Sequence, residues 1–167
     1  YIRELKCLDL DANKFPCYTF AVNNVYFISN SGDDDTGEEN NPAKPYQTYC
    51  GVHRQLSPGD IVFFREGLYK GIYTNGISYG AYGDECSIPR TIQGTASQPI
   101  LLINYPGERV IIARGYSSLE VSGNDPQYLI FHGLEVNGKD LDPGDNRAGI
   151  MISSPSINIT FREIEAT

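Results

Sequence analysis

The sequence is short of the residue types on which many active sites and membrane segments depend. It has no tryptophan, one methionine and two histidines among its 167 residues. With only His53 and His132 present, neither a histidine-rich metal centre nor a Ser-His-Asp triad is supported. No run of about eighteen apolar residues occurs, so the sequence predicts no membrane-spanning helix.

The sequence has four cysteines, and their spacing argues against two common motifs. Cys7, Cys17, Cys50 and Cys86 include no CxxC pair, which argues against a zinc ribbon and a thioredoxin-type motif. Together with the acidic composition, they indicate a secreted, extracellular or cell-surface protein with up to two disulfides. We favour Cys7 with Cys17 and Cys50 with Cys86, because the first pair closes a short loop. The two other pairings, and four buried free thiols, stay open as alternatives.

Positive charge is in deficit. Thirteen Lys and Arg stand against twenty-one Asp and Glu, which gives a net charge of −8 and a pI near 4.7. The averaged field repels polyanions, so nucleic acid is not expected as a partner. An acidic polysaccharide would need a bridging cation such as Ca²⁺ or a local basic patch. The sequence begins at Tyr1, which we interpret as a mature or excised piece.

What the sequence does contain is a repeat. Residues 128–136 (YLIFHGLEV) align with residues 158–166 (NITFREIEA), about thirty positions later. In this alignment Leu129 matches Ile159, and Phe131 matches Phe161. A fixed period of this size in strand-like sequence indicates a solenoid, in which each coil buries its apolar face only by stacking on the next.

Short apolar runs separated by Gly, Asn and Pro turns define the predicted strands. They fall at 25–28, 61–64, 100–103, 110–113, 119–121, 129–131, 150–152 and 159–161. Three short strands per coil predict an all-β fold, a parallel β-helix of triangular section. We expect residues 1–24 to form an N-terminal extension and residues 25–167 to form one domain. Within it we expect a capping helix at about 48–56 and an insertion loop at about 74–98.

Three stretches carry a family resemblance. They are residues 25–48 (VYFISNSGDDDTGEENNPAKPYQT), 56–71 (LSPGDIVFFREGLYKG) and 94–115 (GTASQPILLINYPGERVIIARG). Along the chain come a strand, a Ser-Gly-Asp turn, the predicted capping helix, and Pro-Gly-Asp before a strand that ends in Gly-x-Tyr. These stretches resemble the N-terminal coils of right-handed parallel β-helix proteins of the pectate lyase and alginate lyase kind. The resemblance implies a right-handed β-helix that binds an acidic polysaccharide with Ca²⁺ and cleaves it by β-elimination. In those lyases the catalytic residues lie on later coils, so none is assigned here.

Two acidic stretches are candidates for a cation site. Residues 33–35 (DDD) are expected to form a structural turn, because Asp side chains there accept hydrogen bonds from backbone amides. In the second stretch Asp140, Asp142 and Asp145 can converge on one Ca²⁺ through oxygen ligands, although a solvated turn is the competing interpretation. Lys139 and Arg147 flank this loop and are weak candidates for the base of a lyase.

The remaining candidates concern surface contacts. Tyr73, Tyr79 and Tyr82 lie in a Gly-rich stretch and offer flat rings on which sugars stack. Asn158 opens an Asn-Ile-Thr sequon, which matters in a eukaryotic secretory route. His132 is expected on the outer surface of its strand, and His53 on the surface of the capping helix.

Two functions of different classes follow. The first is a secreted carbohydrate-binding module that, in a complete form, acts as a polysaccharide lyase. The second is a non-catalytic structural or adhesive protein. Residues 157–167 begin a fresh coil with no helical cap of their own, and such an end can stack head to tail into a fibre.

Overall fold

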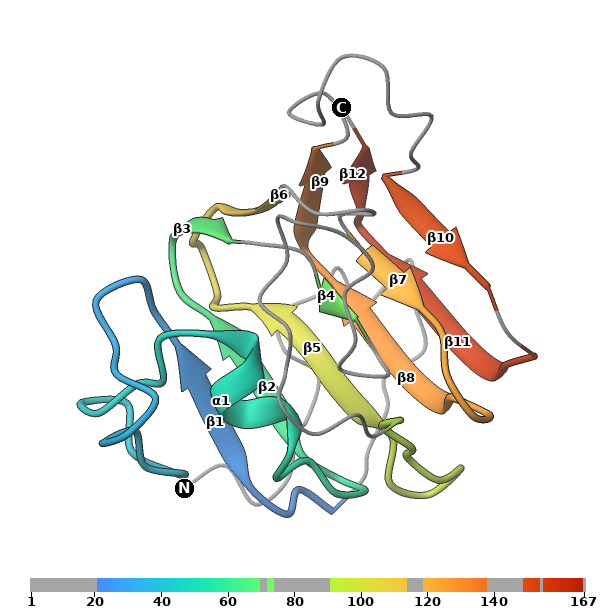
Figure 1. Ribbon diagram of the computed structural model, residues 1–167, viewed down its shortest axis with the longest axis horizontal. Helices are drawn as coiled ribbons and strands as arrows, with labels where there is room; N and C mark the ends of the chain where they lie inside the picture. The colour runs from blue at the N-terminus through green and yellow to red at the C-terminus, as the bar shows by residue number, and fades with distance from the viewer. Residues whose placement is uncertain are drawn as a thin grey trace.

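In the part of the chain that the computed structural model describes, the regular elements are β-strands apart from one short helix (Figure 1). This part comprises residues 21–69, 72–73, 91–113, 119–137, 149–153 and 155–166. Its elements, in chain order, are β1 (Val25–Ile28), α1 (Tyr49–His53), β2 (Ile61–Phe64), β3 (Gly67–Tyr69), β4 (Ile72–Tyr73), β5 (Ile100–Asn104), β6 (Val110–Ala113), β7 (Leu119–Val121), β8 (Gln127–His132), β9 (Leu134–Asn137), β10 (Ile150–Ile152), β11 (Ile157–Arg162) and β12 (Glu165–Ala166).

The strands form three parallel sheets. The five-stranded sheet has the order β1-β2-β5-β8-β11, the four-stranded sheet β12-β9-β6-β3, and the three-stranded sheet β10-β7-β4. The chain therefore makes successive passes: β2, β3 and β4 form one, β5, β6 and β7 the next, and β8, β9 and β10 a third. The final described strands, β11 and β12, begin a fourth pass. The predicted all-β class with parallel strands is confirmed.

The register confirms the sequence repeat. Ile159 pairs with Leu129, and Phe161 pairs with Phe131. The rings of the two phenylalanines stack at 5.2 Å between centroids with 12° between their planes. Equivalent residues of neighbouring passes therefore lie directly above one another, as a period of about thirty residues requires.

Alternating residues of the strands build one central core. Val62 and Phe64 of β2, Leu102 of β5, and Leu129 and Phe131 of β8 all point to the same side of their sheet and are fully buried. The core also receives side chains from the four-stranded and three-stranded sheets and from α1. It ends in partly buried residues of the last passes, Ile150, Ile159, Phe161 and Ile164.

A second apolar cluster lies on the opposite face of the five-stranded sheet. Its buried members are Phe27, Ile61, Phe63, Leu101, Ile103 and Ile130. Because Ile61 and Phe63 alternate with the core residues Val62 and Phe64, β2 is apolar on both faces. A strand that is buried on both faces is a continuous apolar run in sequence, as residues 61–64 and 100–103 are.

The helix is shorter than predicted. It covers Tyr49–His53, with Thr48 as the N-cap, whose hydroxyl accepts from the N–H of Gly51. Oδ1 of Asp34 accepts hydrogen bonds from the N–H groups of Gln47 at 2.8 Å and Thr48 at 2.9 Å. A Cβ at position 51 would lie 2.3 Å from Oδ1 of Asp34, so only glycine permits this close approach. The turn before the helix thus holds the helix start in place.

The turn itself has the predicted structural role. Oδ1 of Asp33 accepts from the N–H groups of Asp35 at 2.8 Å and Thr36 at 3.1 Å. With Asp34 bonded to the helix start, Asp33 and Asp34 both serve backbone amides. The interpretation of residues 33–35 as a structural turn is confirmed.

The expectation for His53 is wrong. The side chain is fully buried, and its ring lies edge-on to that of Tyr49 at 5.3 Å between centroids. In this five-residue helix Tyr49, Gly51, Val52 and His53 are all buried, so no exposed face remains for the histidine. Helical periodicity identifies a surface only where a helix leaves one face in water.

Two corners of the five-stranded sheet require left-handed backbone. Gly133 follows β8 with a φ of 65°, and Glu163 follows β11 with a φ of 47°. They occupy equivalent places, because His132 pairs with Arg162 immediately before them. A Cβ on Gly133 would lie 2.0 Å from Oδ1 of Asn104 in the preceding pass. The left-handed corner therefore occurs twice. After β8 it is occupied by glycine, which adopts this backbone easily, and after β11 by glutamate, for which it is unfavourable.

Candidate functional site

The three-stranded sheet contains strands that border two of the predicted site stretches in the sequence. β4 ends at Tyr73, and β10 follows directly on residues 138–148, which contain the predicted cation loop. β7 lies between β4 and β10 in the sheet. Its middle residue, Glu120, pairs in register with Tyr73 on one side and Met151 on the other. The topology thus brings the flanks of both predicted stretches to one sheet.

Glu120 is an unusual residue in this position. Its neighbours Leu119 and Val121 belong to the central core, so alternation places Glu120 on the opposite face of the sheet. It is nevertheless only 1% exposed. Oε1 accepts a hydrogen bond from the Ser153 hydroxyl at 3.3 Å, whereas Oε2 is buried and has no hydrogen-bond partner among the described residues. A buried carboxylate oxygen without a donor is costly, so it favours binding of a cation or a hydroxyl donor.

Asp60 shows how the same chain satisfies a buried carboxylate elsewhere. Its Oδ2 accepts from the N–H of Ser57 at 2.7 Å, and its Oδ1 from the N–H of Asn24 at 3.0 Å. Burial raises the pKa of Asp60, while these backbone donors act in the opposite direction. Asp60 therefore has a structural role, which distinguishes it from Glu120.

The sequence interpretation overlooked Glu120. Residues 119–121 (LEV) are predicted as a strand, and the acid in the middle of that strand is the available signal. A single acid within a short apolar strand is expected on the outer face and exposed. Burial of that outer face depends on neighbouring segments, which strand periodicity does not report.

Most of the predicted site residues lie outside the described residues. These are Tyr79, Tyr82, Lys139, Asp140, Asp142, Asp145 and Arg147. Within the described ranges, no three His, Cys, Asp or Glu side chains are grouped closely enough to hold a metal ion. The Ca²⁺ site and the base of a lyase therefore stay predictions.

Of the four cysteines, only Cys50 lies among the described residues. Cys50, in α1, is disulfide-bonded. Cys7, Cys17 and Cys86 lie outside the described residues. The pairing of Cys50 with Cys86 is still a prediction.

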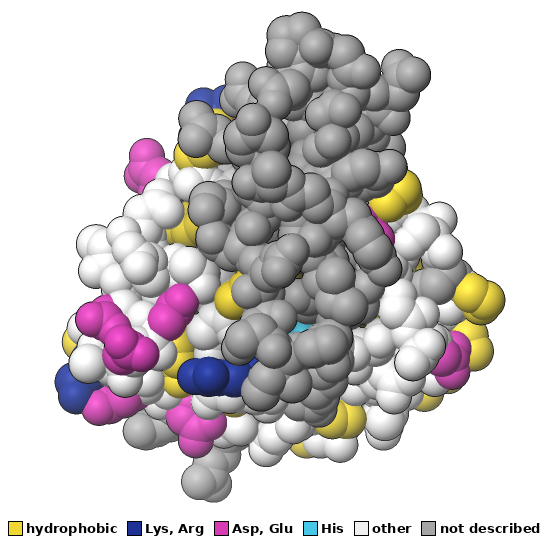
Figure 2. Space-filling model, viewed as in Figure 1, with side chains coloured by type: hydrophobic (Ala, Val, Ile, Leu, Met, Phe, Trp, Pro, Cys, Tyr) yellow, Lys and Arg dark blue, Asp and Glu magenta, His cyan; other side chains and the backbone are white. Residues whose placement is uncertain are grey.

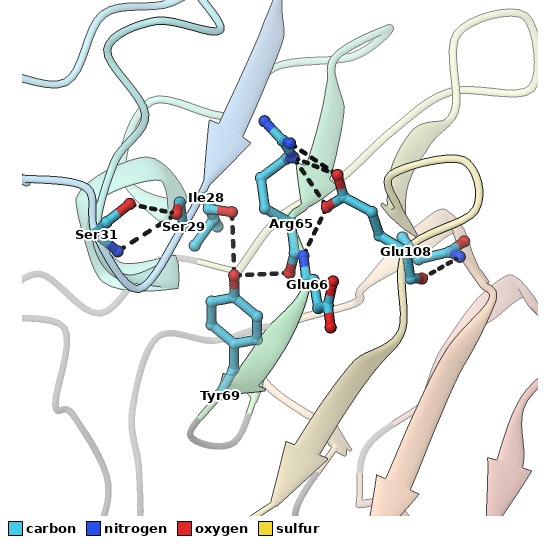
Figure 3. Close-up of polar contacts among 8 residues, drawn as sticks. Ile28, Ser29, Ser31, Arg65, Glu66, Tyr69 and Glu108 are labelled. Carbon is cyan, nitrogen blue, oxygen red and sulfur yellow. Dashed lines mark hydrogen bonds and ion pairs between the residues drawn. The ribbon is translucent and has the colours of Figure 1, made fainter.

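An ion-paired corner joins the first two passes (Figure 3). Nε of Arg65 donates to both carboxylate oxygens of Glu108 at 2.9 Å, and its Nη2 donates to Oε1 at 2.7 Å. The N–H of Glu66 donates to Oε2 of Glu108 at 2.6 Å. These bonds hold the pKa of Glu108 below its usual value, and the carboxylate raises the pKa of Arg65. Arg65 also lies over the ring of Tyr105, 4.6 Å from its centroid.

Tyr69 completes this corner. Its hydroxyl lies between the carbonyl oxygens of Arg65 at 2.8 Å and Ile28 at 3.2 Å (Figure 3). Burial raises the pKa of Tyr69 to about 12, so the hydroxyl keeps its proton and acts as a donor. Every polar group named at this corner has a partner. We therefore interpret the corner as a structural connection between passes.

The described arginines of the corner supply no unpaired positive charge. Arg65 is held by Glu108, and Nη2 of Arg109 lies 2.6 Å from Oε2 of Glu135 on the next pass. Glu165 pairs in register with Glu135 and adds a further negative charge. A local basic patch that could attract an acidic polysaccharide is not built by these residues.

Acidic side chains also gather over the loop between β1 and α1, on the left of the view in Figure 2. The loop carries Asp33, Asp34, Asp35, Glu38 and Glu39. Lys44 pairs with Glu38. The field at this end of the molecule is negative, which disfavours contact with a polyanion without a bridging cation.

His132 lies on the outer face of β8, as predicted, but it is not exposed. The residue is 9% exposed, and its Nε2 lies 3.6 Å from Oε2 of Glu163. Its Nδ1 is buried, and no described residue forms a hydrogen bond with it. Burial lowers the pKa of His132; Glu163 opposes this effect and Arg162 adds to it. The imidazole is therefore neutral near pH 7, with a weak contact to the half-exposed Glu163.

Asn158 is exposed on β11, and its φ of 54° is left-handed.

Among the described residues, no helix has the length and apolar character needed to cross a membrane.

Comparison with known proteins gives one informative similarity. No protein-family model matches the sequence, and no curated protein matches it. Among solved structures, a rhamnogalacturonan lyase matches with a TM-score of 0.62 and 18% sequence identity. The match covers 86% of this chain and 36% of that chain. At this identity the similarity concerns the fold alone: this chain is similar in fold to about a third of a rhamnogalacturonan lyase.

Proposed function

We propose that this chain is a polysaccharide-binding β-helix module. In this proposal the three parallel sheets are the sides of a right-handed parallel β-helix, with α1 covering its first pass. Two findings support it: each of the three complete passes adds one strand to each sheet, and the fold is similar to that of part of a rhamnogalacturonan lyase. Parallel strands joined by such crossovers are right-handed in nearly all known cases.

The proposed ligand is an acidic polysaccharide outside the cytoplasm. The similar solved structure is named for its action on rhamnogalacturonan, and the sequence resembles pectate and alginate lyases. Because the net charge of this chain is −8, a bridging cation is required, and Ca²⁺ is the proposed one. Since the match covers 36% of that lyase, cleavage belongs to a longer form in this proposal.

The observation that carries the choice of site is the buried Glu120, whose Oε2 has no hydrogen-bond partner within the described part of the chain. It lies in the middle of the three-stranded sheet, beside Tyr73 in register. A carboxylate oxygen accepts hydrogen bonds from sugar hydroxyls and also coordinates Ca²⁺. Residues 138–148, which contain the predicted acidic loop, precede β10 in the sequence.

The chemistry of the longer form would be β-elimination. A base takes the C5 proton of a uronic acid, the electron pair forms the C4–C5 double bond, and the glycosidic oxygen leaves with a proton. Ca²⁺ on the uronate carboxylate would stabilise the charge that develops at C5. Lys139 and Arg147 stay candidates for the base.

Binding and cleavage are tested separately. Calorimetry with rhamnogalacturonan, pectate and alginate, each with Ca²⁺ and with a chelator, measures affinity, and ultraviolet absorbance detects the unsaturated product. We expect Ca²⁺-dependent binding that weakens about tenfold or more in Glu120→Gln and in Tyr73→Ala. Glu163→Gln is the control, because Glu163 is half exposed at another corner, and it should bind as the wild type does. A folded wild type that binds none of the three polymers contradicts the proposal.

One observation favours a second candidate, a self-assembling structural protein. Ile159, Phe161 and Ile164 pack on the core but are only partly buried, and Ile157 is 47% exposed. Among the described strands, nothing pairs with the outer edge of β11. Such an edge can pair with a strand of another copy.

The other end of the sheet is less available. The outer edge of β1 is bonded to its own loop, since the N–H of Tyr46 donates to Phe27 O at 2.8 Å and that of Asn40 donates to Val25 O at 2.7 Å. This favours two copies joined through their β11 ends over a head-to-tail fibre. Sedimentation over a range of concentrations tests the candidate. A monomer at every concentration, with no fibres in electron micrographs, contradicts it.

A further inference from the structure

The outer face of the five-stranded sheet changes character at its last strand. On β2, β5 and β8 this face carries the buried apolar residues Ile61, Phe63, Leu101, Ile103 and Ile130. On β11 the register partner of Ile130 is Thr160, and the partner of His132 is Arg162. The apolar outer cluster therefore stops at β8, and β11 presents polar residues on that side.

Asn158 lies at the start of this polar side. Ile157 pairs with Gln127 and Ile159 pairs with Leu129, but position 158 is left out of the register. The backbone there is left-handed, with a φ of 54°, and the residue is exposed. Because Ile159 packs on the core, Asn158 and Thr160 flank it on the outer side.

The backbone does not by itself explain an asparagine here. Tyr128, the equivalent residue of the preceding pass, has a φ of 52°, so this left-handed position also accepts a side chain that disfavours it. Asn158 is at the same time the first residue of an Asn-Ile-Thr sequon, and the sequence contains no other Asn-x-Ser/Thr. Exposure, an irregular strand and a threonine on the same side are the features of an accessible acceptor.

We propose that Asn158 carries an N-linked glycan, and that the glycan shields the open edge of β11. The side-chain nitrogen of Asn158 forms a bond to C1 of a sugar. The C1–O bond to the pyrophosphate of a lipid-linked oligosaccharide breaks, and the amide proton leaves with it. The step needs a eukaryotic secretory route, in keeping with the extracytoplasmic location proposed above.

Shielding follows from where the acceptor lies. Asn158 belongs to the strand whose outer edge has no partner among the described strands, and Ile157 beside it is 47% exposed. A bulky hydrophilic glycan on this strand hinders the approach of a second strand edge. Bulky or charged groups at edge strands are a common protection against unwanted pairing.

The acceptor is tested by secretion of the chain from a eukaryotic host and by its intact mass before and after enzymatic deglycosylation. We expect the wild type and Thr160→Ser to carry the added mass, and Asn158→Gln and Thr160→Ala to lack it. Thr160→Ser is the matched control, since it keeps the hydroxyl that the sequon needs. A secreted wild type with the unmodified mass overturns the proposal.

The shielding is tested by sedimentation of the same proteins at matched concentrations. Glycosylated wild type should stay monomeric where Asn158→Gln and deglycosylated wild type associate. Equal association of all three overturns the shielding. Thr160→Ala gives a second unglycosylated chain that keeps Asn158, in case Asn158→Gln folds poorly. Neither readout involves a polysaccharide, so these results are independent of the proposed binding function.

Discussion

The third pass and the fourth pass of this chain have the same pattern but not the same surroundings. Phe131 has a neighbouring strand on each side and is fully buried, whereas Phe161 is partly buried and has, among the described strands, a neighbour on one side only. The same contrast holds for Leu129 and Ile159. Repetition in the sequence thus fixes where a residue lies, while its stabilising effect depends on how many passes enclose it.

The strongest test of this contrast replaces one phenylalanine at a time. Phe131→Ala should lower the free energy of unfolding by about 3–5 kcal/mol, because it opens a cavity within the core. Phe161→Ala should cost about 1–2 kcal/mol, because its site is open to solvent on one side. Urea unfolding followed by circular dichroism measures both. Equal losses would mean that the fourth pass is enclosed as fully as the third.

The two corner residues provide the second test, because substitutions there should change the stability of the protein in opposite directions. Gly133→Ala should destabilise the protein by about 2 kcal/mol, since left-handed backbone is unfavourable for alanine and Asn104 must move. Glu163→Gly should stabilise it by up to about 1 kcal/mol, because glycine relieves the left-handed strain at the equivalent place. The urea midpoints of the two variants should move in opposite directions. A loss of stability in Glu163→Gly would contradict the equivalence of the corners.

Charge pairs make the third test. Glu108→Gln should cost about 1 kcal/mol, because the carboxylate accepts from Arg65 and from the N–H of Glu66 near the surface. Glu163→Gln should cost close to nothing, since its contact with His132 is long and half exposed. The pKa of Glu108 is lowered on folding, so its contribution is present above about pH 4.5 and is lost as the pH falls below that value. In urea unfolding, the difference in free energy of unfolding between the wild type and Glu108→Gln should be smaller at acidic pH than at neutral pH.

The smallest expected effect concerns His132. Folding lowers its pKa, so the unfolded chain binds more protons just below the ordinary histidine pKa of about 6.5. The contribution of the neutral imidazole is thus present above that value and declines as the pH falls. Between about pH 7 and about pH 5.5, the wild type should lose more stability than His132→Gln. Parallel pH profiles would show that His132 is solvated in the folded protein.

Much of the fold could be predicted because it depends on local periodicity. The alignment of Leu129 with Ile159 and of Phe131 with Phe161 became strand register, because equal spacing places equal residues on neighbouring strands. His53 could not be placed in this way. Its burial depends on what packs against a helix of five residues, which the sequence of that helix does not contain.

The candidate site was less predictable for the same reason. The topology places β4, which ends at Tyr73, and β10 in one sheet, a proximity that the sequence analysis did not predict. Glu120, the residue that now distinguishes this sheet, looks in sequence like any outward acid in a strand. Its importance comes from its burial and from the lack of a donor to Oε2 among the described residues, and both depend on the folded structure.

The one-to-one register between passes has a consequence for how such a chain can change over evolutionary time. Each sheet gains its strands in order, and the described strands of one pass pair with strands of the passes beside it. Duplication or deletion of one whole unit between β5 and β8 would leave every other pairing unaltered. Duplication or deletion within the gene can therefore lengthen or shorten the molecule in whole units. Insertion or deletion of a single residue within a strand would instead move its side chains to the opposite face of the sheet.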